Sequence, residues 1–108
     1  MKTETERVRE LRRAILRTLR ACQGDAYEGW LSQRSLFNVL RSGEPEGLTM
    51  FEVGRACAYL AGKLYVEVRA RSESKIEQAD RDWRITPAGV DLMDETIPPD
   101  PGVEDNRV

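Results

Sequence analysis

A change of hydrophobic period marks residues 48–69, where helical spacing gives way to strand alternation. Thr49 and Glu52 have the spacing of a capping box, in which each side chain satisfies a backbone N–H group, so a helix is predicted to begin directly after Thr49. Gly62 is expected to take a positive φ near the end of this helix, and residues 65–69 then alternate as a strand. At about 100° per residue, the apolar face of the helix consists of Val53, Ala56, Cys57, Leu60 and Leu64.

The rest of the chain repeats these two patterns. Thr86 followed by Pro87 predicts a helix start, because an N-cap hydroxyl precedes the position where proline costs no hydrogen bond. Two alternating segments flank a long polar stretch and predict a β-hairpin. In chain order the expected elements are a helix over residues 4–22, a short extended piece at 30–31, a helix over 33–41, the helix after Thr49, strands over 65–71 and 83–85, and a helix from 87 to about 95.

Composition limits the size of the protein and its location. With 108 residues, 40% of them apolar and 33% charged, the chain supports one small domain. Apolar runs are too short for a membrane span, and the first residues lack the apolar centre of a signal peptide, so a cytoplasmic protein without membrane contact is expected. Cys22 and Cys57 both fall on predicted apolar helix faces, and we expect small buried residues there instead of a disulfide.

The end of the chain differs from the rest in charge. The net charge is −2, yet residues 87–108 carry six acidic side chains against one basic one. Because residues 96–108 are also rich in proline, they are predicted to form an extended or disordered acidic tail that packs against nothing, after a folded domain over residues 1–95. One hypothesis is that this acidic segment folds over the basic first helix or the hairpin and imitates nucleic-acid phosphate.

Catalytic chemistry finds little support in the sequence. The chain has no histidine, both cysteines are placed in the core, and neither a glycine-rich phosphate loop nor a metal-ligand spacing occurs. Asp80 and Asp82 are interpreted as solvated loop residues. The sequence therefore predicts a protein that is not an enzyme and that uses no cofactor, metal or small-molecule substrate.

Six arginines occupy polar positions of the predicted first helix. Glu6 and Glu10 offer some of them partners one turn away, which favours an ordinary solvated helix face. Guanidinium groups also bind phosphate and carboxylate well, and six arginines exceed what the three glutamates of this helix can pair. A surface that faces phosphate or acidic groups is therefore the alternative. The six are Arg7, Arg9, Arg12, Arg13, Arg17 and Arg20.

The predicted elements occur in a familiar order, carried by the apolar first helix, Trp30-Leu31, Leu48–Val53, Tyr59-Leu60, Tyr65–Val68 and Trp83–Gly89. Over residues 7–95 this order resembles the winged helix-turn-helix family in its small bacterial and phage form. Residues 85–89 resemble the I-T-x-x-G closure common in that group, and residues 89–93 with 101–103 are similar to winged-helix proteins of Mu-like phage gene clusters. The resemblance implies an α+β fold with a three-helix core, a β-hairpin wing and an additional C-terminal helix.

In this family the third helix enters the DNA major groove and the wing contacts DNA backbone or minor groove, so the resemblance implies a DNA-binding transcriptional regulator. Charge argues against strong binding, because acidic side chains nearly cancel the basic ones of the wing. These acidic residues are Glu73, Glu77, Asp80 and Asp82. The DNA-contacting residues that the resemblance implies are Arg55, Tyr59 and Lys63 on the third helix and Arg69, Arg71, Lys75, Arg81 and Arg84 on the wing.

The alternative function is a winged-helix module that binds another protein, or a second copy of itself, without reading a DNA sequence. Phe51, Arg55 and Tyr59 fall on outward positions of the third helix. Aromatic residues and arginine are enriched at the centres of protein interfaces, so these three are the candidate contact residues. A homodimer is one form of this alternative, since the first and last helices often form the dimer contact in the family.

Overall fold

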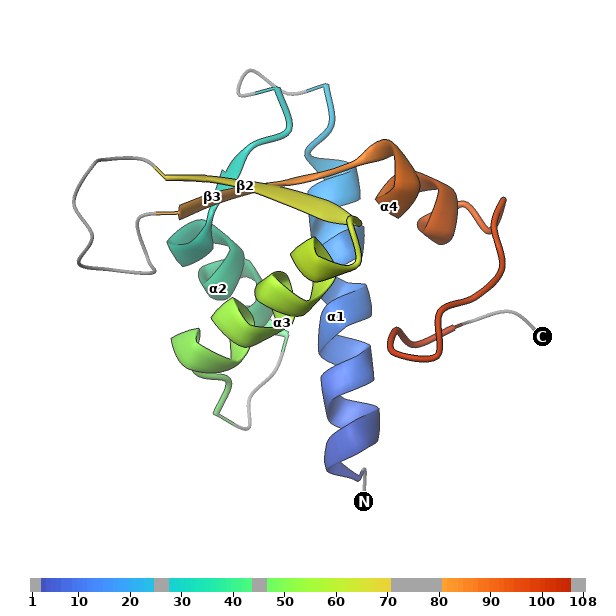
Figure 1. Cartoon of the computed structure of the whole chain (residues 1–108). Helices are drawn as coiled ribbons and strands as arrows, with labels where there is room; N and C mark the ends of the chain where they lie inside the picture. The colour runs from blue at the N-terminus through green and yellow to red at the C-terminus, as the bar shows by residue number, and fades with distance from the viewer. Residues whose placement is uncertain (1–2, 25–27, 44–46, 71–80, 106–108) are drawn as a thin grey trace.

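The computed structural model describes residues 3–24, 28–43, 47–70 and 81–105, which form four helices and one three-stranded antiparallel sheet (Figure 1). The predicted α+β class is therefore confirmed, and every element lies within two residues of its predicted bounds. In chain order the elements are α1 (Glu4–Ala21), β1 (Leu31–Ser32), α2 (Gln33–Ser42), α3 (Met50–Gly62), β2 (Val66–Ala70), β3 (Arg81–Ile85) and α4 (Pro87–Met93).

Each helix begins at a hydroxyl side chain that caps its first turn. The capping box of α3 is complete: the Thr49 hydroxyl accepts a hydrogen bond from the Glu52 N–H at 3.1 Å, and Glu52 Oε1 accepts one from the Thr49 N–H at 3.2 Å. These local contacts explain why the helix starts were predictable. The N-caps of the four helices are Thr3, Ser32, Thr49 and Thr86.

Strand β3 lies at the centre of the sheet, between β1 and β2, and carries the largest core side chain. Trp83 pairs with Leu31 on one side and Val68 on the other. Its indole N–H donates to the buried Gln33 side-chain oxygen at 3.1 Å, so the polar atom of the ring is satisfied inside the core. The buried apolar residues around it come from all four helices and from strands β2 and β3, and they include Ile15, Leu16, Leu19, Leu36, Val53, Cys57, Leu60, Val66, Ile85 and Leu92.

The junction between α3 and β2 differs from the prediction in which residue is left-handed. Gly62 stays within the helix, and Leu64 has a φ of 66° and is 72% exposed, so its predicted place in the core is wrong. The Tyr65 N–H donates to the Leu60 carbonyl at 2.9 Å, and the Leu64 N–H donates to the Ala61 carbonyl at 3.0 Å. This pair of bonds is a Schellman motif, which fixes the left-handed residue at position 64.

The two cysteines have different environments. Cys57 is buried as predicted, and burial raises the pKa of its thiol to about 12. Cys22 lies at the end of α1 and is only half-buried, so the prediction of two core cysteines holds for one of them. Neither cysteine forms a disulfide within the described part of the chain.

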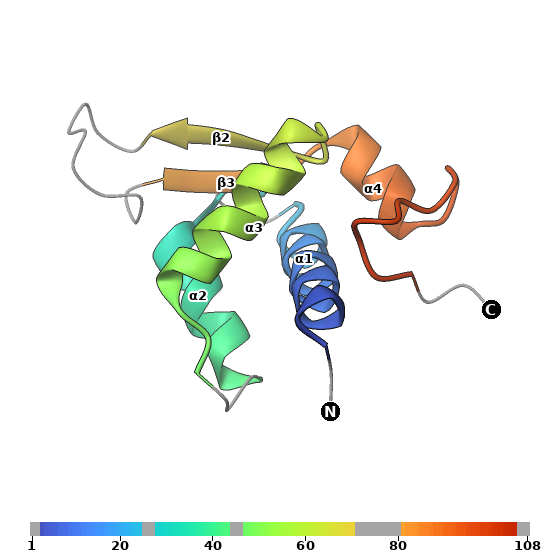
Figure 2. The ribbon, with the colours of Figure 1, turned by 60° about the horizontal axis from the view of Figure 1, so that its bottom comes forward.

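The prediction of a tail that packs against nothing is wrong for residues 96–105, which we call the C-terminal strap. Val103 is 2% exposed and belongs to the hydrophobic core. Figures 1 and 2 both show the strap on the side of α1 that faces away from α2 and α3. Three arginines of α1 hold it there by donating to consecutive main-chain carbonyls: Arg12 to Gly102 at 2.9 Å, Arg9 to Val103 at 3.3 Å and Arg13 to Glu104 at 3.1 Å.

A buried carboxylate fixes the middle of the strap. The side chain of Asp100 accepts hydrogen bonds from the Tyr65 hydroxyl and the Gly102 N–H, both at 2.7 Å, and lies 3.7 Å from Lys63 Nζ. Burial raises the pKa of Asp100, and the contacts with these three groups outweigh it, so the pKa lies below its usual value. The strap is thus joined to the end of α3 as well as to α1.

Candidate functional site

Two of the arginines predicted to contact DNA are held on the face of the sheet opposite the core. Arg69 Nη2 lies 3.2 Å from Asp82 Oδ2, and Arg84 forms an ion pair with Glu67 on the neighbouring strand. Both guanidinium groups also lie 4.4 Å from the centre of the Trp30 ring. These two side chains are therefore engaged in contacts within the protein.

The other predicted hairpin residues are placed differently. Arg81 is exposed at the start of β3, whereas Arg71 and Lys75 lie outside the described residues. Lys63, at the C-terminal end of α3, is half-exposed and contacts Asp100 of the strap. Three of the five predicted DNA-contacting cations that the structure describes, Lys63, Arg69 and Arg84, thus have a carboxylate partner.

The structure brings Phe51, Arg55 and Tyr59 together along one groove between α1 and α3, which lie against each other in Figure 2. This α1–α3 groove has a volume of about 500 Å³. The sequence had indicated these three residues as a contact surface, but it gave no indication that α1 supplies the opposite wall. The lining residues from α1 are Glu4, Arg7, Val8, Leu11 and Arg12, and those from α3 are Phe51, Glu52, Arg55, Ala56 and Tyr59.

Tyr59 is turned toward α1 and forms the inner end of the groove. The Arg12 guanidinium lies 3.5 Å from the centre of the Tyr59 ring, and Lys63 Nζ lies 5.8 Å from it. The Tyr59 hydroxyl borders Gly102 so closely that a Cβ on this glycine would overlap it. One ring face and the hydroxyl are thus occupied by neighbours, so Tyr59 contacts the strap instead of standing free on the outer face of α3.

Phe51 and Arg55 form the outer edge of the groove. Phe51 is 63% exposed, and the exposed Arg55 guanidinium lies 5.7 Å from the centre of its ring. The apolar side chains of Val8, Leu11 and Ala56 also line the groove. An exposed aromatic ring next to arginine, at the edge of a groove lined by both apolar and charged side chains, is a composition found at interface centres.

An ion pair connects the two walls of this groove. Arg7 Nη2 of α1 lies 3.1 Å from Glu52 Oε2 of α3, while Glu52 also completes the capping box with Thr49. The negative charge of Glu52 is therefore used twice inside the protein. Because Arg7 neutralises part of its charge, the Glu52 carboxylate repels an approaching anion less than an unpaired glutamate would at the start of α3.

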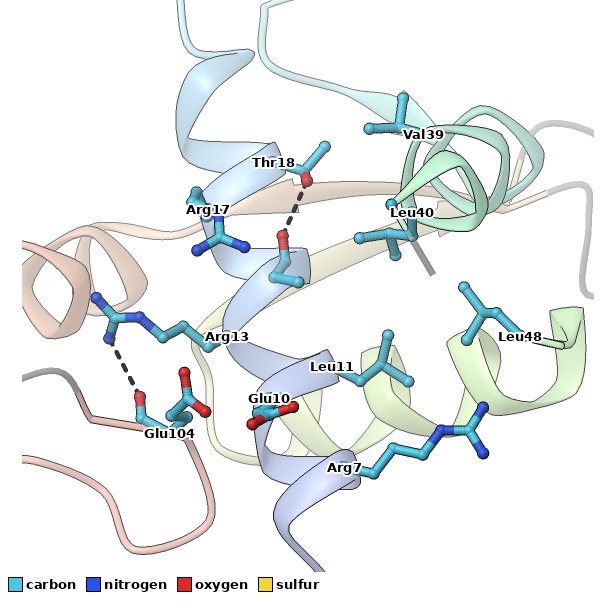
Figure 3. A pocket seen from close by; sticks show the side chains of 12 residues that line it. Arg7, Glu10, Leu11, Arg13, Arg17, Thr18, Val39, Leu40, Leu48 and Glu104 are labelled. Atoms are coloured by element: carbon cyan, nitrogen blue, oxygen red, sulfur yellow. Dashed lines mark hydrogen bonds between the residues drawn. The ribbon is translucent and has the colours of Figure 1, made fainter. Parts of the chain in front are cut away.

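A second groove lies between α1 and the end of α2, and the sequence did not reveal it (Figure 3). It has a volume of about 460 Å³. Val39, one of the apolar positions of the predicted second helix, is 52% exposed at its edge, and Arg17 of α1 also lines it. This α1–α2 groove shares Arg7 and Leu11 with the α1–α3 groove, so the N-terminal half of α1 forms a ridge between the two.

Neither groove shows a metal site. Among the residues that the structure describes, no group of three histidine, cysteine, aspartate or glutamate side chains is arranged to hold a metal ion. Within the same residues, no helix combines the length and the apolar character needed to cross a membrane.

Comparisons with protein-family models, with curated proteins and with solved structures find no match to this chain.

Proposed function

We propose that this chain is a winged-helix domain that binds another protein through the α1–α3 groove. The winged-helix part of the proposal is supported by the order of the elements, helix, strand, helix, helix, two strands and helix, and by a sheet in which β3 lies between β1 and β2. The antiparallel hairpin of β2 and β3 then corresponds to the wing.

The observation that carries the binding proposal is the exposure of Phe51 beside Arg55 at the edge of a groove that is partly apolar. A large aromatic side chain that is mostly in water gains free energy when a partner covers it, at about 25 cal/mol per Å² of apolar surface. Arginine next to it adds hydrogen bonds and contact with the ring. The groove offers the partner a place to insert an apolar side chain.

DNA binding is the second candidate, and it is supported by the same order of elements and by the exposed Arg55 and Arg81. Its strength follows from the number of phosphate contacts. Each contact contributes roughly −0.9 to the slope of log K against log salt concentration, so Arg55 and Arg81, the two candidate cations without a carboxylate partner among the described residues, predict a slope of about −2. Proteins with roughly six to ten phosphate contacts reach far steeper slopes. The ion pairs of Lys63, Arg69 and Arg84 therefore favour a protein partner.

Peptide selection tests the proposal directly. Peptides selected from a random display library for binding to the wild-type protein should bind Phe51→Ala at least about tenfold more weakly, because truncating a hot-spot aromatic residue typically costs about 2 kcal/mol or more. Val68→Ala is the matched control, since Val68 is an exposed apolar residue on β2 outside the groove. Equal losses in both variants, or no loss in either, would show that the groove is not the binding surface.

The DNA candidate is tested on the same preparations. Fluorescence anisotropy with a random-sequence duplex, measured over a series of salt concentrations, should give weak binding and a slope of about −2. A slope of about −5 or steeper, together with loss of affinity in Arg55→Gln, would overturn the preference for a protein partner. The homodimer stays a prediction, and light scattering at high protein concentration measures it.

A further inference from the structure

Two arginines, one from each wall, line the α1–α3 groove, and neither forms an ion pair with a residue that the structure describes. Arg12 comes from α1 and Arg55 from α3, and both line the groove. Their charges are close enough to act on one another: burial lowers the pKa of Arg12, Tyr59 and Asp100 raise it, and the positive charge of Arg55 lowers it again. Two like charges held at one site are unfavourable until an anion is placed near both.

The hydrogen-bonding capacity of Arg12 is only partly used. One terminal nitrogen donates to the Gly102 carbonyl at 2.9 Å, and the guanidinium stacks on the Tyr59 ring, which fixes its position. Its Nε atom is buried and has no hydrogen-bond partner in the described part of the chain, so an incoming group would reach Arg12 only at its other terminal N–H groups. Arg55 has an aromatic neighbour, Phe51, and no ion pair with any residue that the structure describes.

The carboxylates near these two arginines are largely committed elsewhere. Three arginines line the groove against two glutamates. Glu52 is paired with Arg7, and Glu4 stands in the first turn of α1, where it favours the positive end of the helix dipole. Asp100, in the middle of the strap, is buried and contacts Tyr65 and Lys63. One unit of positive charge thus remains in the groove beside an apolar surface.

We infer that the α1–α3 groove contains a carboxylate-binding subsite between Arg12 and Arg55, and that its partner is a protein segment with an acidic side chain next to an apolar one. The apolar side chain covers Phe51 and fills the space beside Val8 and Leu11, while the carboxylate accepts hydrogen bonds from the two guanidinium groups. A nucleic-acid backbone supplies the anion but not the adjacent apolar group, so charge and lining together favour a protein segment. This inference rests on the proposed protein-binding function and names the chemistry of its partner.

The probe for this subsite is 3-phenylpropionate, which joins a phenyl ring to a carboxylate, and the matched neutral probe is 3-phenylpropanamide. Nuclear magnetic resonance titration of the ¹⁵N-labelled full chain should shift the amides of Phe51, Arg55 and Ala56. For a ligand of this size we expect a Kd on the order of 1–10 mM for the acid. The amide should bind about fivefold more weakly, because it lacks the charge-assisted hydrogen bonds.

Substitution of Arg55 separates charge from shape. Arg55→Gln, at an exposed position, should lower the affinity for the acid toward that for the amide, because only Arg12 then remains in the subsite, and should leave the affinity for the amide unchanged. Arg81→Gln, an exposed arginine outside the groove, should change neither. Equal binding of acid and amide, or an acid affinity that Arg55→Gln does not alter, would overturn the carboxylate subsite. If inorganic phosphate shifts the same amides through Arg55 and the acid does not, the subsite belongs to a phosphate ligand and the inference is also overturned.

The two proposals fail in distinguishable ways. If peptide binding depends on Phe51 but acidic residues are not preferred, and the acid and the amide bind equally, the protein-binding function stands and the carboxylate subsite is refuted. If the acid binds through Arg55 but no peptide depends on Phe51, the carboxylate subsite stands and the protein-binding function is refuted.

Discussion

Replacing Gly89 by alanine tests the closure between β3 and α4. Gly89 lies in the first turn of α4, against the main-chain carbonyl of Tyr65 at the start of β2. An added Cβ would overlap that carbonyl and lie 2.7 Å from Ile85 Cγ1. The carbonyl cannot move aside freely, because it also accepts the Thr86 N–H at 3.0 Å. The glycine of the I-T-x-x-G segment is therefore explained by a close approach of two main chains.

The expected loss follows from three contributions. Forcing an extra carbon into a packed site typically costs about 1–3 kcal/mol, and weakening the hydrogen bond between Thr86 and Tyr65 costs about 1 kcal/mol. The higher helix propensity of alanine offsets up to about 1 kcal/mol of this loss in the free energy of unfolding. The net loss in the free energy of unfolding is about 1–3 kcal/mol, which for a domain of this size lowers Tm by about 5–20 °C.

Gly62→Ala is the matched control for this experiment. Gly62 is the last residue of α3, its φ is not positive, and no atom lies within 4 Å of an added Cβ. Alanine there should raise the free energy of unfolding by up to about 1 kcal/mol. Thermal and urea denaturation, followed by circular dichroism, measure both variants. A Gly89→Ala protein that melts within about 3 °C of the wild type would refute the close-approach explanation.

Two further variants test the α3–β2 junction and the strap. Leu64→Asn should raise the free energy of unfolding by about 0.5–1 kcal/mol in urea denaturation, because asparagine tolerates the left-handed conformation better than leucine. A decrease would show that the left-handed Leu64 backbone is not strained. Asp100 has a pKa below its unfolded value of about 3.9, so its contribution to stability is present above about pH 4 and is lost as the pH falls through the folded pKa. Asp100→Asn should therefore lower Tm at pH 6 and flatten the fall of Tm between about pH 4 and pH 2; an unchanged acid profile would contradict this assignment.

The sequence predicted features of the fold that depend on neighbouring residues. Thr49 and Glu52 fix the start of α3 within a single turn, so their spacing alone is informative. The end of the same helix was not predictable in this way. The left-handed residue is set by the bond from Tyr65 to Leu60, and a glycine two positions earlier was the stronger local signal. The tertiary structure fixes where β2 begins, and this places Leu64 in the left-handed conformation although leucine disfavours it.

The C-terminal strap shows a second limit of local patterns. Only Ile97 and Val103 are apolar aliphatic residues within residues 96–105, and no period connects them. What holds the strap is the recognition of its main-chain carbonyls by arginine side chains some ninety residues earlier in the chain. Main-chain carbonyls are present in every sequence, so this contact leaves no compositional trace.

The candidate site was predicted in part for the same reason. Helical spacing assigned Phe51, Arg55 and Tyr59 to the outward side of α3, and all three line one groove. The spacing carried no information on what packs beside that side. Arg12 of α1 covers Tyr59 and leaves Phe51 exposed. Tyr59 therefore forms the inner end of the groove, and Phe51 and Arg55 form its outer edge, a difference that the spacing did not predict.

The arginines of α1 show why a count of basic residues does not measure the charge that a partner encounters. The sequence offered two interpretations for them, a solvated face or a surface toward phosphate or acid. In the structure Arg9 and Arg13 bind the strap, and Arg20 lies 3.3 Å from Asp94, so much of this basic character is used within the domain. A guanidinium bound to a carbonyl keeps its charge but loses donors for an incoming group. Partner choice then depends on those arginines that lie beside apolar surface without an ion pair among the described residues, and in the α1–α3 groove these are Arg55 and Arg12, the second of which also holds the strap at Gly102.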